Sequence, residues 1–325
     1  MSEIEFRHAV RDAIDVEMER DPSVVVFGED VAAAGGVFQA TRGLHEKYGS
    51  RRVFDTPISE LALAGAAYGA AISGLRPVIE IMFGDFTMLA MDSLVNQAAK
   101  YWYVSNGQGS APLVIRSAVG GGGGFAAIHS QIPATWLMGV PGIKIAAPST
   151  PDDAMGLLRS AIQDDNPVVF LEHKRLYSIK GEVSGEAIPL SSAKVVRPGG
   201  DITIVTAMKA VHDAIEAAAT LAEEGIAAEV VDLRTIRPLD LDTILASVAK
   251  TRRLVVVEEG PRTGGFAAEV LALLVEHAPG EFEQAWRVTE PDLPVPYSPP
   301  LEKAFLPGTE AIADSIRARL GVAAA

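Results

Sequence analysis

Residues 53–81 read VFDTPISELALAGAAYGAAISGLRPVIEI, and this stretch decides the predicted fold. Val53-Phe54 and Pro77–Ile81 are short apolar runs of the kind that form buried strands. Between them, Ser59 is a helix-capping residue, Glu60–Ser73 has the composition of a helix, and a glycine follows directly. A strand, a helix and a second strand in this order are typical of a buried parallel sheet.

The same alternation extends on both sides of this unit. Four further runs are short and apolar enough to be buried strands: Val24–Phe27, Leu113–Ile115, Ile143–Ala146 and Val168–Leu171. Thr150–Gln163 begins with helix-starting residues and predicts another helix. Near the amino terminus, Ser2 and Glu5 have capping-box spacing before an amphipathic helix that should end at Asp21-Pro22.

The length of 325 residues is enough for two domains. Residues 1–180 form the first predicted domain, residues 181–200 lose periodicity and predict a linker, and residues 201–325 form a second, smaller domain. Its expected strands are Ile202–Val205, Ala228–Leu233 and Leu254–Val257, and its expected helices are Val211–Glu224, Leu241–Ala249, Gly265–His277 and Glu310–Arg319. The predicted fold class is therefore α/β, with two doubly wound parallel-sheet domains.

Composition excludes several kinds of function. The formal net charge of −14 argues against a nucleic-acid partner, because phosphate backbones select surfaces rich in Lys and Arg. The absence of cysteine removes disulfides, thiol nucleophiles and cysteine-ligated metals. Residues 1–21 carry charges throughout, and no run of about 18 apolar residues occurs, so we expect a cytoplasmic protein without a membrane span.

Carboxylates follow several of the predicted strands, where ligands bind in open parallel sheets. Gly28-Glu29-Asp30, Asp55, Glu172-His173 and Glu258-Glu259 all occupy such positions, although most could be helix caps. Glu60 opens a helix of small apolar residues. From the residues alone, a capping role there is the more common interpretation, and contact with a ligand is the alternative.

Two other features invite a functional interpretation beside a structural one. Glu80 lies inside a predicted strand, where a carboxylate is costly unless it has a partner; it belongs either to an interface or proton network or to a structural ion pair. The run Gly120–Gly124 predicts a pliable loop that carries His129, although a histidine at such a position is more often structural. Gly65, Gly69 and Gly74 are too widely spaced for a dinucleotide fingerprint.

A series of short motifs occurs in a fixed order along nearly the whole chain. They are Phe27–Val31, Gly35–Phe38, Val53–Glu60, Gly74–Pro77, Asp92–Lys100, His129–Gln131, Pro141-Gly142, Ala147–Thr150, Asp165–Val168, Val231–Thr235 and Pro294–Pro307. Together they resemble beta subunits of the thiamine-diphosphate-dependent decarboxylating component of 2-oxo acid dehydrogenases, of pyruvate, acetoin or branched-chain type, in the transketolase superfamily. The resemblance implies a pyrimidine-binding thiamine-diphosphate domain followed by a transketolase C-terminal-like domain.

The resemblance also implies roles for individual residues. Glu60 matches the glutamate that hydrogen-bonds the cofactor's aminopyrimidine ring. Phe86 would pack against that ring with Ile58 nearby, and His129 would serve proton transfer near the substrate mouth. Glu29 matches a buried acid that connects the two active sites of the assembly in relatives.

Metal ligands follow from the same resemblance. Gly84-Asp85-Phe86 does not match the Gly-Asp-Gly motif that holds magnesium and diphosphate in thiamine enzymes, so we expect an alpha subunit to hold magnesium. The backbone oxygens of Leu113, Ala161, Asp164 and Asn166 match a potassium site of some relatives.

The implied partners are an alpha subunit, in a heterotetramer of two alpha and two beta chains, and a lipoyl-bearing acyltransferase. The implied substrate is a 2-oxo acid or acetoin, and Glu80–Phe86 looks most like the acetoin enzymes. The unbroken glycine run departs from the relatives. Two alternatives stay open: a split transketolase, for which no dense Arg/His cluster is present, and a non-catalytic assembly subunit whose Glu258-Glu259 and Gly264-Gly265 serve dimer contacts.

Overall fold

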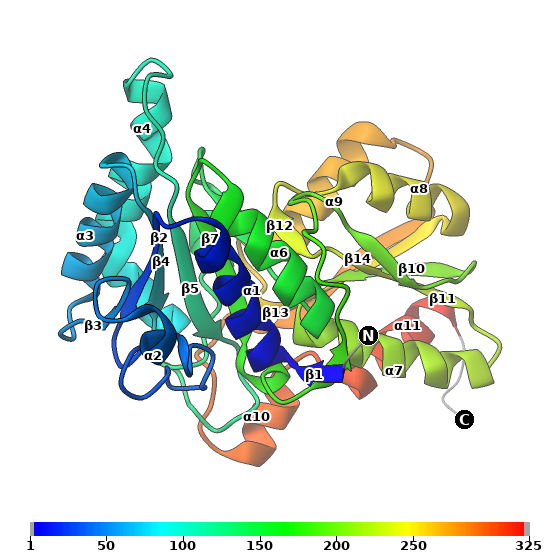
Figure 1. Ribbon diagram of the computed structural model, residues 1–325. Helices are drawn as coiled ribbons and strands as arrows, with labels where there is room; N and C mark the ends of the chain where they lie inside the picture. Colours follow the sequence, from blue (N-terminus) through cyan, green and yellow to red (C-terminus); the bar gives the residue numbers. More distant parts are fainter. Residues whose placement is uncertain (1–2, 322–325) are drawn as a thin grey trace.

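The first large sheet lies at the centre of the amino-terminal part of the computed structural model, which describes residues 3–321 (Figure 1). Its strand order is β12-β6-β7-β5-β4-β2-β3. The strands are β2 (Val24–Gly28), β3 (Val53–Asp55), β4 (Arg76–Ile81), β5 (Val114–Val119), β6 (Lys144–Ala146), β7 (Val168–His173) and β12 (Thr235–Arg237). All pair in parallel except β12, which lies antiparallel to β6 at one edge.

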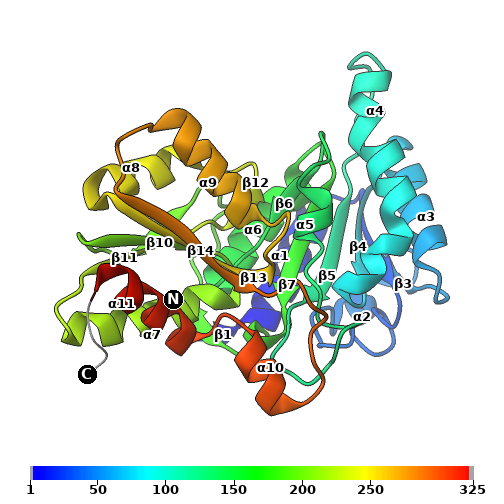
Figure 2. The same ribbon diagram turned by 180° about the vertical axis from the view of Figure 1, so that it is seen from behind.

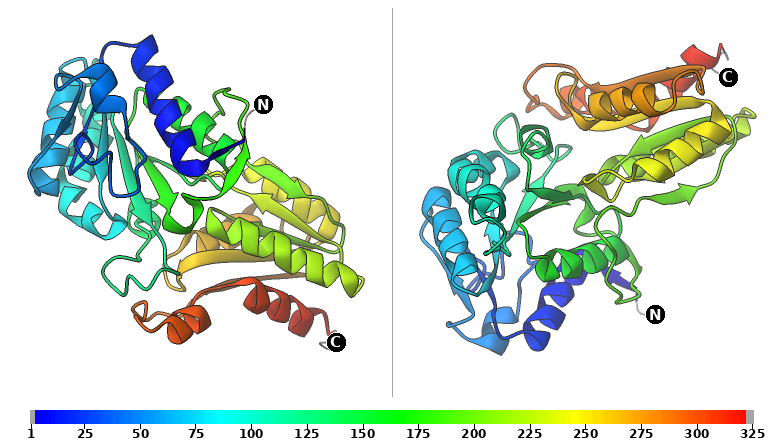
Figure 3. Two further views of the ribbon diagram at one scale, coloured as in Figure 1. Left: turned by 60° about the horizontal axis from the view of Figure 1, so that its bottom comes forward. Right: turned by 90° about the horizontal axis from the view of Figure 1, so that it is seen from above.

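Helices cover this sheet on both faces. They are α1 (Phe6–Arg20), α2 (Leu44–Tyr48), α3 (Glu60–Ile72), α4 (Ala99–Val104), α5 (Ala134–Leu137) and α6 (Pro151–Gln163), with the 3₁₀ helices η1 (Gly84–Ala90) and η3 (Lys174–Leu176) and the π-helix η2 (Asp92–Ala98). The view from above shows α1 and α6 side by side on one face and α3 on the other (Figure 3). Strands β2, β4, β5 and β7 are buried almost throughout between these layers, which explains why most of their residues are apolar.

The second large sheet has the order β14-β13-β10-β11-β9. Its strands are β9 (Lys194–Arg197), β10 (Ile202–Thr206), β11 (Ala228–Asp232), β13 (Arg253–Pro261) and β14 (Gln284–Glu290), and only β9 is antiparallel to its neighbour. The accompanying helices are α7 (Lys209–Glu223), α8 (Leu241–Thr251), α9 (Phe266–His277), α10 (Pro299–Phe305) and α11 (Thr309–Leu320). Both predicted parallel-sheet units are therefore confirmed, with one antiparallel edge strand added to each.

Side chains alternate between the two faces of the second sheet, as the period of a strand requires. Ile202 and Ile204 of β10 pack into a separate core with α7 and α11. Val205 lies in the larger core, which includes α8 and α9 and is continuous with the core of the first sheet. Strand β12 comes directly after β11 in the sequence. Strand β11 belongs to the second sheet, whereas β12 pairs at the edge of the first sheet. The two halves are thus joined by shared core and shared sheet.

Two predictions about local structure need correction. Residues Glu3–Glu5 form strand β1, which pairs with β8 (Lys180–Glu182), and α1 begins at Phe6 without a side-chain cap. Ser2 of the expected capping box lies outside the described residues. The segment 181–200, expected to be a linker, begins with the end of β8 and contains β9. The division into residues 1–180 and 201–325 itself stays a prediction.

Candidate functional site

The predicted site residues lie in segments that leave the carboxyl edge of the first sheet. Glu29 follows β2, Glu60 begins α3 after β3, Phe86 lies in η1 after β4, and His129 lies in the loop after β5. Because these four strands are parallel and adjacent, their carboxyl ends meet at one edge. Helix α3 packs directly against η1, so the elements that carry Glu60 and Phe86 are in contact.

Glu60 is buried at the amino-terminal end of α3, with 6% of its surface exposed. Among the hydrogen bonds and ion pairs formed by residues 3–321, none involves its carboxylate. The helix dipole favours negative charge at this position. A buried carboxylate that makes no internal bond has both oxygens available to a ligand.

Ser59 occupies the N-cap position of α3, but its hydroxyl makes no capping hydrogen bond, so that part of the sequence prediction is wrong. Its ψ of 85° departs from the extended conformation of Thr150, which does cap α6. The Ser59 backbone N–H lowers the pKa of the Glu29 carboxyl group, which places the entrance of α3 close to the residue that follows β2.

The pKa of the Glu29 carboxyl group lies above its ordinary value. Burial raises its pKa above the ordinary glutamate value, and the negative charges of Glu60 and Asp30 raise it further. Its Oε1 atom is buried and has no hydrogen-bond partner among the described residues. The negative charge of Glu60 is therefore close enough to act on the Glu29 carboxyl group.

An aromatic cluster surrounds His129. The imidazole ring lies edge-on to Phe83, at 4.6 Å between ring centroids, and to Phe86, at 5.4 Å. Phe83 also contacts Phe86 and Phe125, at 6.1 and 6.2 Å. The structure therefore brings together two of the predicted site residues, Phe86 from η1 and His129 from the loop after β5.

Ile58 lies on the surface, with 83% of its side chain exposed. Exposed apolar side chains also occur at Leu61 of α3 and at Met88 and Leu89 of η1. Because α3 and η1 are in contact, these residues form an apolar rim beside Glu60. Such a surface is typical of a site that another molecule covers.

Glu80 takes part in a buried ion-pair network, as one of the two sequence interpretations proposed. The Arg116 guanidinium binds Glu80 at 2.9 Å and Glu172 at 2.7 Å, and Tyr177 donates to Glu172 at 2.9 Å. Burial raises the pKa of Glu80, whereas the charge of Arg116 lowers it. The network joins β4, β5 and β7 below the site.

Glu258 and Glu259 have contacts within the chain. Glu258 accepts hydrogen bonds from the backbone N–H groups of Phe266 and Ala267, at 2.9 and 2.8 Å, and so caps α9. Glu259 accepts from Gly121 at 2.6 Å and lies 2.9 Å from His173 Nε2. The sequence placed both residues after a strand but contained no sign of these partners.

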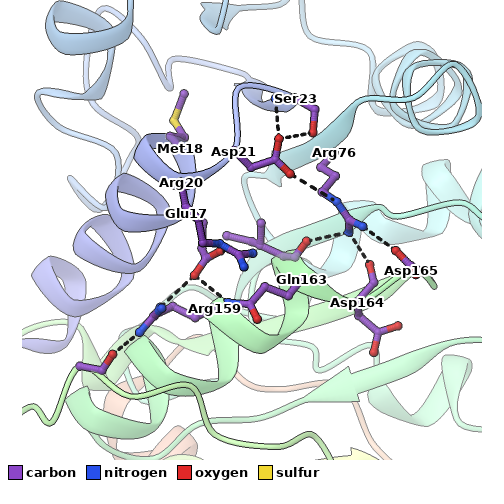
Figure 4. A network of polar contacts seen from close by, with 12 residues as sticks. Glu17, Met18, Arg20, Asp21, Ser23, Arg76, Arg159, Gln163, Asp164 and Asp165 are labelled. Carbon is purple, nitrogen blue, oxygen red and sulfur yellow. Dashed lines mark hydrogen bonds and ion pairs between the residues drawn. The ribbon is translucent and has the colours of Figure 1, made fainter.

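Two of the expected potassium ligands, Asp164 and Asn166, lie in the turn between α6 and β7, whereas Ala161 lies near the end of α6 and Leu113 directly precedes β5. Figure 4 shows Asp164 beside Arg76. The carbonyl of Asp164 already accepts from the Arg76 guanidinium at 3.0 Å, and that of Leu113 accepts from Val168 at 2.8 Å. The carbonyl of Ala161 accepts from Asp164 at 3.3 Å. Each carbonyl oxygen retains a second lone pair, so these hydrogen bonds leave room for a bound cation. The positive charge of Arg76 opposes cation binding at Asp164. Potassium binding stays a prediction.

Residues 3–321 contain no cluster of three or more His, Asp or Glu side chains arranged to hold a metal ion. Asp85, from the segment compared with the Gly-Asp-Gly motif, accepts instead from Gln131 Nε2 at 2.7 Å.

Comparison with known proteins identifies the family. The model of the transketolase pyrimidine-binding domain matches residues 2–180, and that of the transketolase C-terminal domain matches residues 191–312. The beta subunit of acetoin:2,6-dichlorophenolindophenol oxidoreductase from Cupriavidus necator is 46% identical, over 97% of this chain and 96% of its own length. The chain belongs to the family of dehydrogenase beta subunits that carry these two transketolase domains.

Other members of this beta-subunit family are about equally similar. Subunit beta-1 of the mitochondrial pyruvate dehydrogenase E1 component from Arabidopsis thaliana is 47% identical, over 95% of this chain and 87% of its own length. The 2-oxoisovalerate dehydrogenase subunit beta from Bacillus subtilis is 44% identical, over 98% of both chains. The family expected from the motifs is confirmed.

A solved structure described as a split gene transketolase, inactive beta4 tetramer, superposes with a TM-score of 0.83 over 98% of this chain and 99% of that chain. Its sequence identity is 23%, so the likeness concerns the fold alone. The fold class is confirmed, and the sequence relatives favour a dehydrogenase subunit over the split transketolase. Among the described helices, none has the length and apolar character needed to cross a membrane.

Proposed function

We propose that this chain is the beta subunit of a thiamine-diphosphate-dependent 2-oxo acid or acetoin dehydrogenase and supplies the pyrimidine half of an active site shared with an alpha subunit. Membership of the beta-subunit family supports this proposal, since the relatives are named as subunits of pyruvate, acetoin and 2-oxoisovalerate enzymes. The single observation that carries it is Glu60, a buried carboxylate without an internal partner at the amino-terminal end of α3.

Thiamine diphosphate, when bound, supplies a nucleophilic carbon and an electron sink for decarboxylation or carbon–carbon cleavage. The residues present fit its pyrimidine ring. Glu60 would exchange a proton with a ring nitrogen, Phe86 would pack against the ring face, and Ile58 would cover it from the exposed rim. Glu29 would lie beside this exchange as a second carboxyl group, whose pKa the charge of Glu60 raises.

His129 would move a proton at the substrate. Its ring is half-buried and edge-on to two phenylalanines, which restrict its orientation while leaving ring nitrogens for hydrogen bonds. Imidazole suits this task because its ordinary pKa lies near neutrality. An acyl product would then pass to the lipoyl group of an acyltransferase component.

The apolar rim supports a partner that completes the site. Ile58, Leu61, Met88 and Leu89 are each more than half exposed, with exposed fractions of 83%, 57%, 55% and 54%. Burying such side chains against a second chain is favourable by about 25 cal/mol per Å² of apolar surface. We assign this role to the alpha subunit of a heterotetramer, which would also hold magnesium and the diphosphate, with potassium at the α6–β7 turn.

Reconstitution tests the proposal. The chain, a co-expressed alpha chain and the two together should be assayed for 2-oxo acid- or acetoin-dependent dye reduction with thiamine diphosphate and magnesium. We expect turnover only from the mixture, with one of pyruvate, branched-chain 2-oxo acids or acetoin preferred. Full activity of the chain alone would contradict a shared site, and a mixture active only on sugar phosphates would favour the split transketolase.

A further inference from the structure

The loop that carries His129 is held by four charged side chains, all of which bind its main chain. The loop runs from Gly120, after β5, to Gln131, before α5. Three carboxylates accept hydrogen bonds from its N–H groups, and one ammonium group donates to a carbonyl. They come from η1, β13, α10 and η3, and so from both halves of the molecule.

The glycine end of the loop binds two of the carboxylates. Glu302 of α10 accepts from Gly122 at 2.9 Å and from Gly124 at 3.0 Å, and Glu259 accepts from Gly121 at 2.6 Å. Figures 1 and 2 show α10 beside the loops at the end of β5. Positive φ values at Gly122 and Gly124 (81° and 71°) let neighbouring N–H groups converge on one anion. The unbroken glycine run therefore has a local physical reason.

The histidine end of the loop binds the other two charges. Asp85 accepts from the backbone and side chain of Gln131, at 3.4 and 2.7 Å. The ammonium of Lys174 donates to the carbonyl of His129 itself. Only 8% of Lys174 is exposed, so this contact is shielded from water.

Lys174 also touches the wall of the aromatic cluster. Its Nζ atom lies over the ring of Phe125 at 4.6 Å and over that of Phe83 at 5.5 Å. Phe83 is the ring that lies closest to the His129 imidazole. One side chain thus fixes both the main chain of His129 and the ring against which its imidazole packs.

We propose that Lys174 is a positioning residue that holds His129 in the orientation the reaction needs, and this inference rests on the proposed function. Lys174 acts through His129 and needs no contact with substrate. The carboxylates help because they fix the rest of the loop and compensate the buried ammonium charge. Displacements of about 1 Å in a catalytic group can cost two orders of magnitude in rate.

The charge balance around Lys174 makes this tether sensitive to alkaline pH. Asp85, Glu259 and Glu302 face the ammonium from η1, β13 and α10, and His129 faces it from the loop. Burial lowers the pKa of Lys174 to about 8, and the three carboxylates oppose that shift. Above this pH the neutral amine loses its attraction to the aromatic faces and the carboxylates, so the loop should loosen.

Lys174→Gln and Lys174→Arg test the inference in the reconstituted complex, with Lys303→Gln as a control at a lysine whose side chain is 82% exposed. At pH 7 the glutamine variant should lose about tenfold or more in kcat with little change in KM. The arginine variant should stay near wild type and lack the fall in kcat above pH 8, because guanidinium remains charged. A glutamine variant with wild-type kcat and an unchanged alkaline fall would overturn the inference.

Hydrogen exchange gives a second readout that does not depend on activity. In Lys174→Gln the amides of residues 120–131 should exchange faster, whereas those of α7 and α11 should not change. The loop of Lys174→Arg should exchange like that of wild type at pH 7. If the reconstituted protein shows no dehydrogenase activity, the proposed function fails, but hydrogen exchange still tests whether Lys174 holds the loop. Unchanged exchange of residues 120–131 in Lys174→Gln would refute that role of Lys174.

Discussion

Arg116 Nη1 lies 2.9 Å from Glu80 Oε2 inside the first sheet, where only 1% of the arginine side chain is exposed. The same guanidinium binds Glu172, so one buried cation compensates two buried carboxylates. The net contribution of such a network to the free energy of unfolding is small, but removing one of its members is costly because the remaining charges stay buried without a partner. It lies directly below the loops that carry the candidate site.

Arg116→Met should therefore destabilise the protein strongly. Removing one partner of a buried ion pair typically costs about 3–5 kcal/mol, because the remaining charges lose compensation. Arg252→Met is the matched control, since its pair with Glu283 is about half exposed on both sides and should contribute about 0–1 kcal/mol. The denaturant midpoint should fall much further in Arg116→Met than in Arg252→Met. Equal falls in the two variants would contradict the role of Arg116 as the centre of a buried ion-pair network.

Asp232 should make stability depend on pH. It is fully buried, binds the hydroxyl of Ser149, and has its pKa raised to about 7 by burial and by the charge of Asp153. The folded state therefore binds a proton on Asp232 more tightly than the unfolded chain does, where the pKa of this carboxyl group is near 3.8. By linkage, this contribution is fully present below pH 4 and is lost as pH rises towards 7.

Asp232→Asn removes the titration. Its Oδ1 can still accept from the backbone N–H of Arg234, and its amide N–H group, in the place of Oδ2, can donate to the hydroxyl oxygen of Ser149. Each unit of pKa difference corresponds to about 1.4 kcal/mol, so the variant should lose less stability than wild type between pH 5 and pH 8. Thermal midpoints at both pH values, taken in the same assembly state, measure this. Parallel pH dependence in the two proteins would show that Asp232 does not titrate in this range.

Gly120→Ala should disturb the junction between the two halves. A Cβ at this position would lie 2.1 Å from His173 Nε2, and the φ of 87° disfavours any L side chain. His173 would be forced away from Glu259. Gly124→Ala is the control, because its φ of 71° carries a similar strain while no atom lies within 4 Å. We expect a larger drop in the denaturant midpoint for Gly120→Ala, and equal drops would show that only the backbone conformation matters.

Regular elements with local signals could be predicted from the sequence. Helix α6 matches its expected bounds, because Thr150 caps it and the apolar face of Pro151–Gln163 is periodic. Strands β2, β4 and β7 were found because burial on both faces leaves a continuous apolar sequence.

The missed strands lack that local signal. Strands β9 and β12 are short and lie antiparallel at sheet edges, and β14 is mostly half-buried with polar and apolar residues mixed. Their pairing depends on distant partners, as when β12 adds to β6 across many intervening residues. Tertiary context decides such segments.

The candidate site also combines residues that a local motif identifies with residues whose role depends on contacts distant in the sequence. Glu60, Phe86 and His129 stand in recognisable motifs, whereas Lys174 and Glu302 act through contacts with residues far away in the sequence. Glu302 meets Gly122 across 180 positions. The glycine run was the one visible signal, because alternating positive φ values require such residues, but nothing local identified the carboxylates that bind there.

The most direct test of the central claim is the turnover of Glu60→Gln in the reconstituted complex, compared with Glu310→Gln, whose carboxylate is exposed. If Glu60 exchanges a proton with the cofactor, the amide should lower kcat by at least about 100-fold, because general acid–base catalysis contributes that much or more. Assembly with the alpha subunit should be unchanged, as shown by the same elution on size exclusion. Wild-type turnover in Glu60→Gln, with normal assembly, would contradict the account.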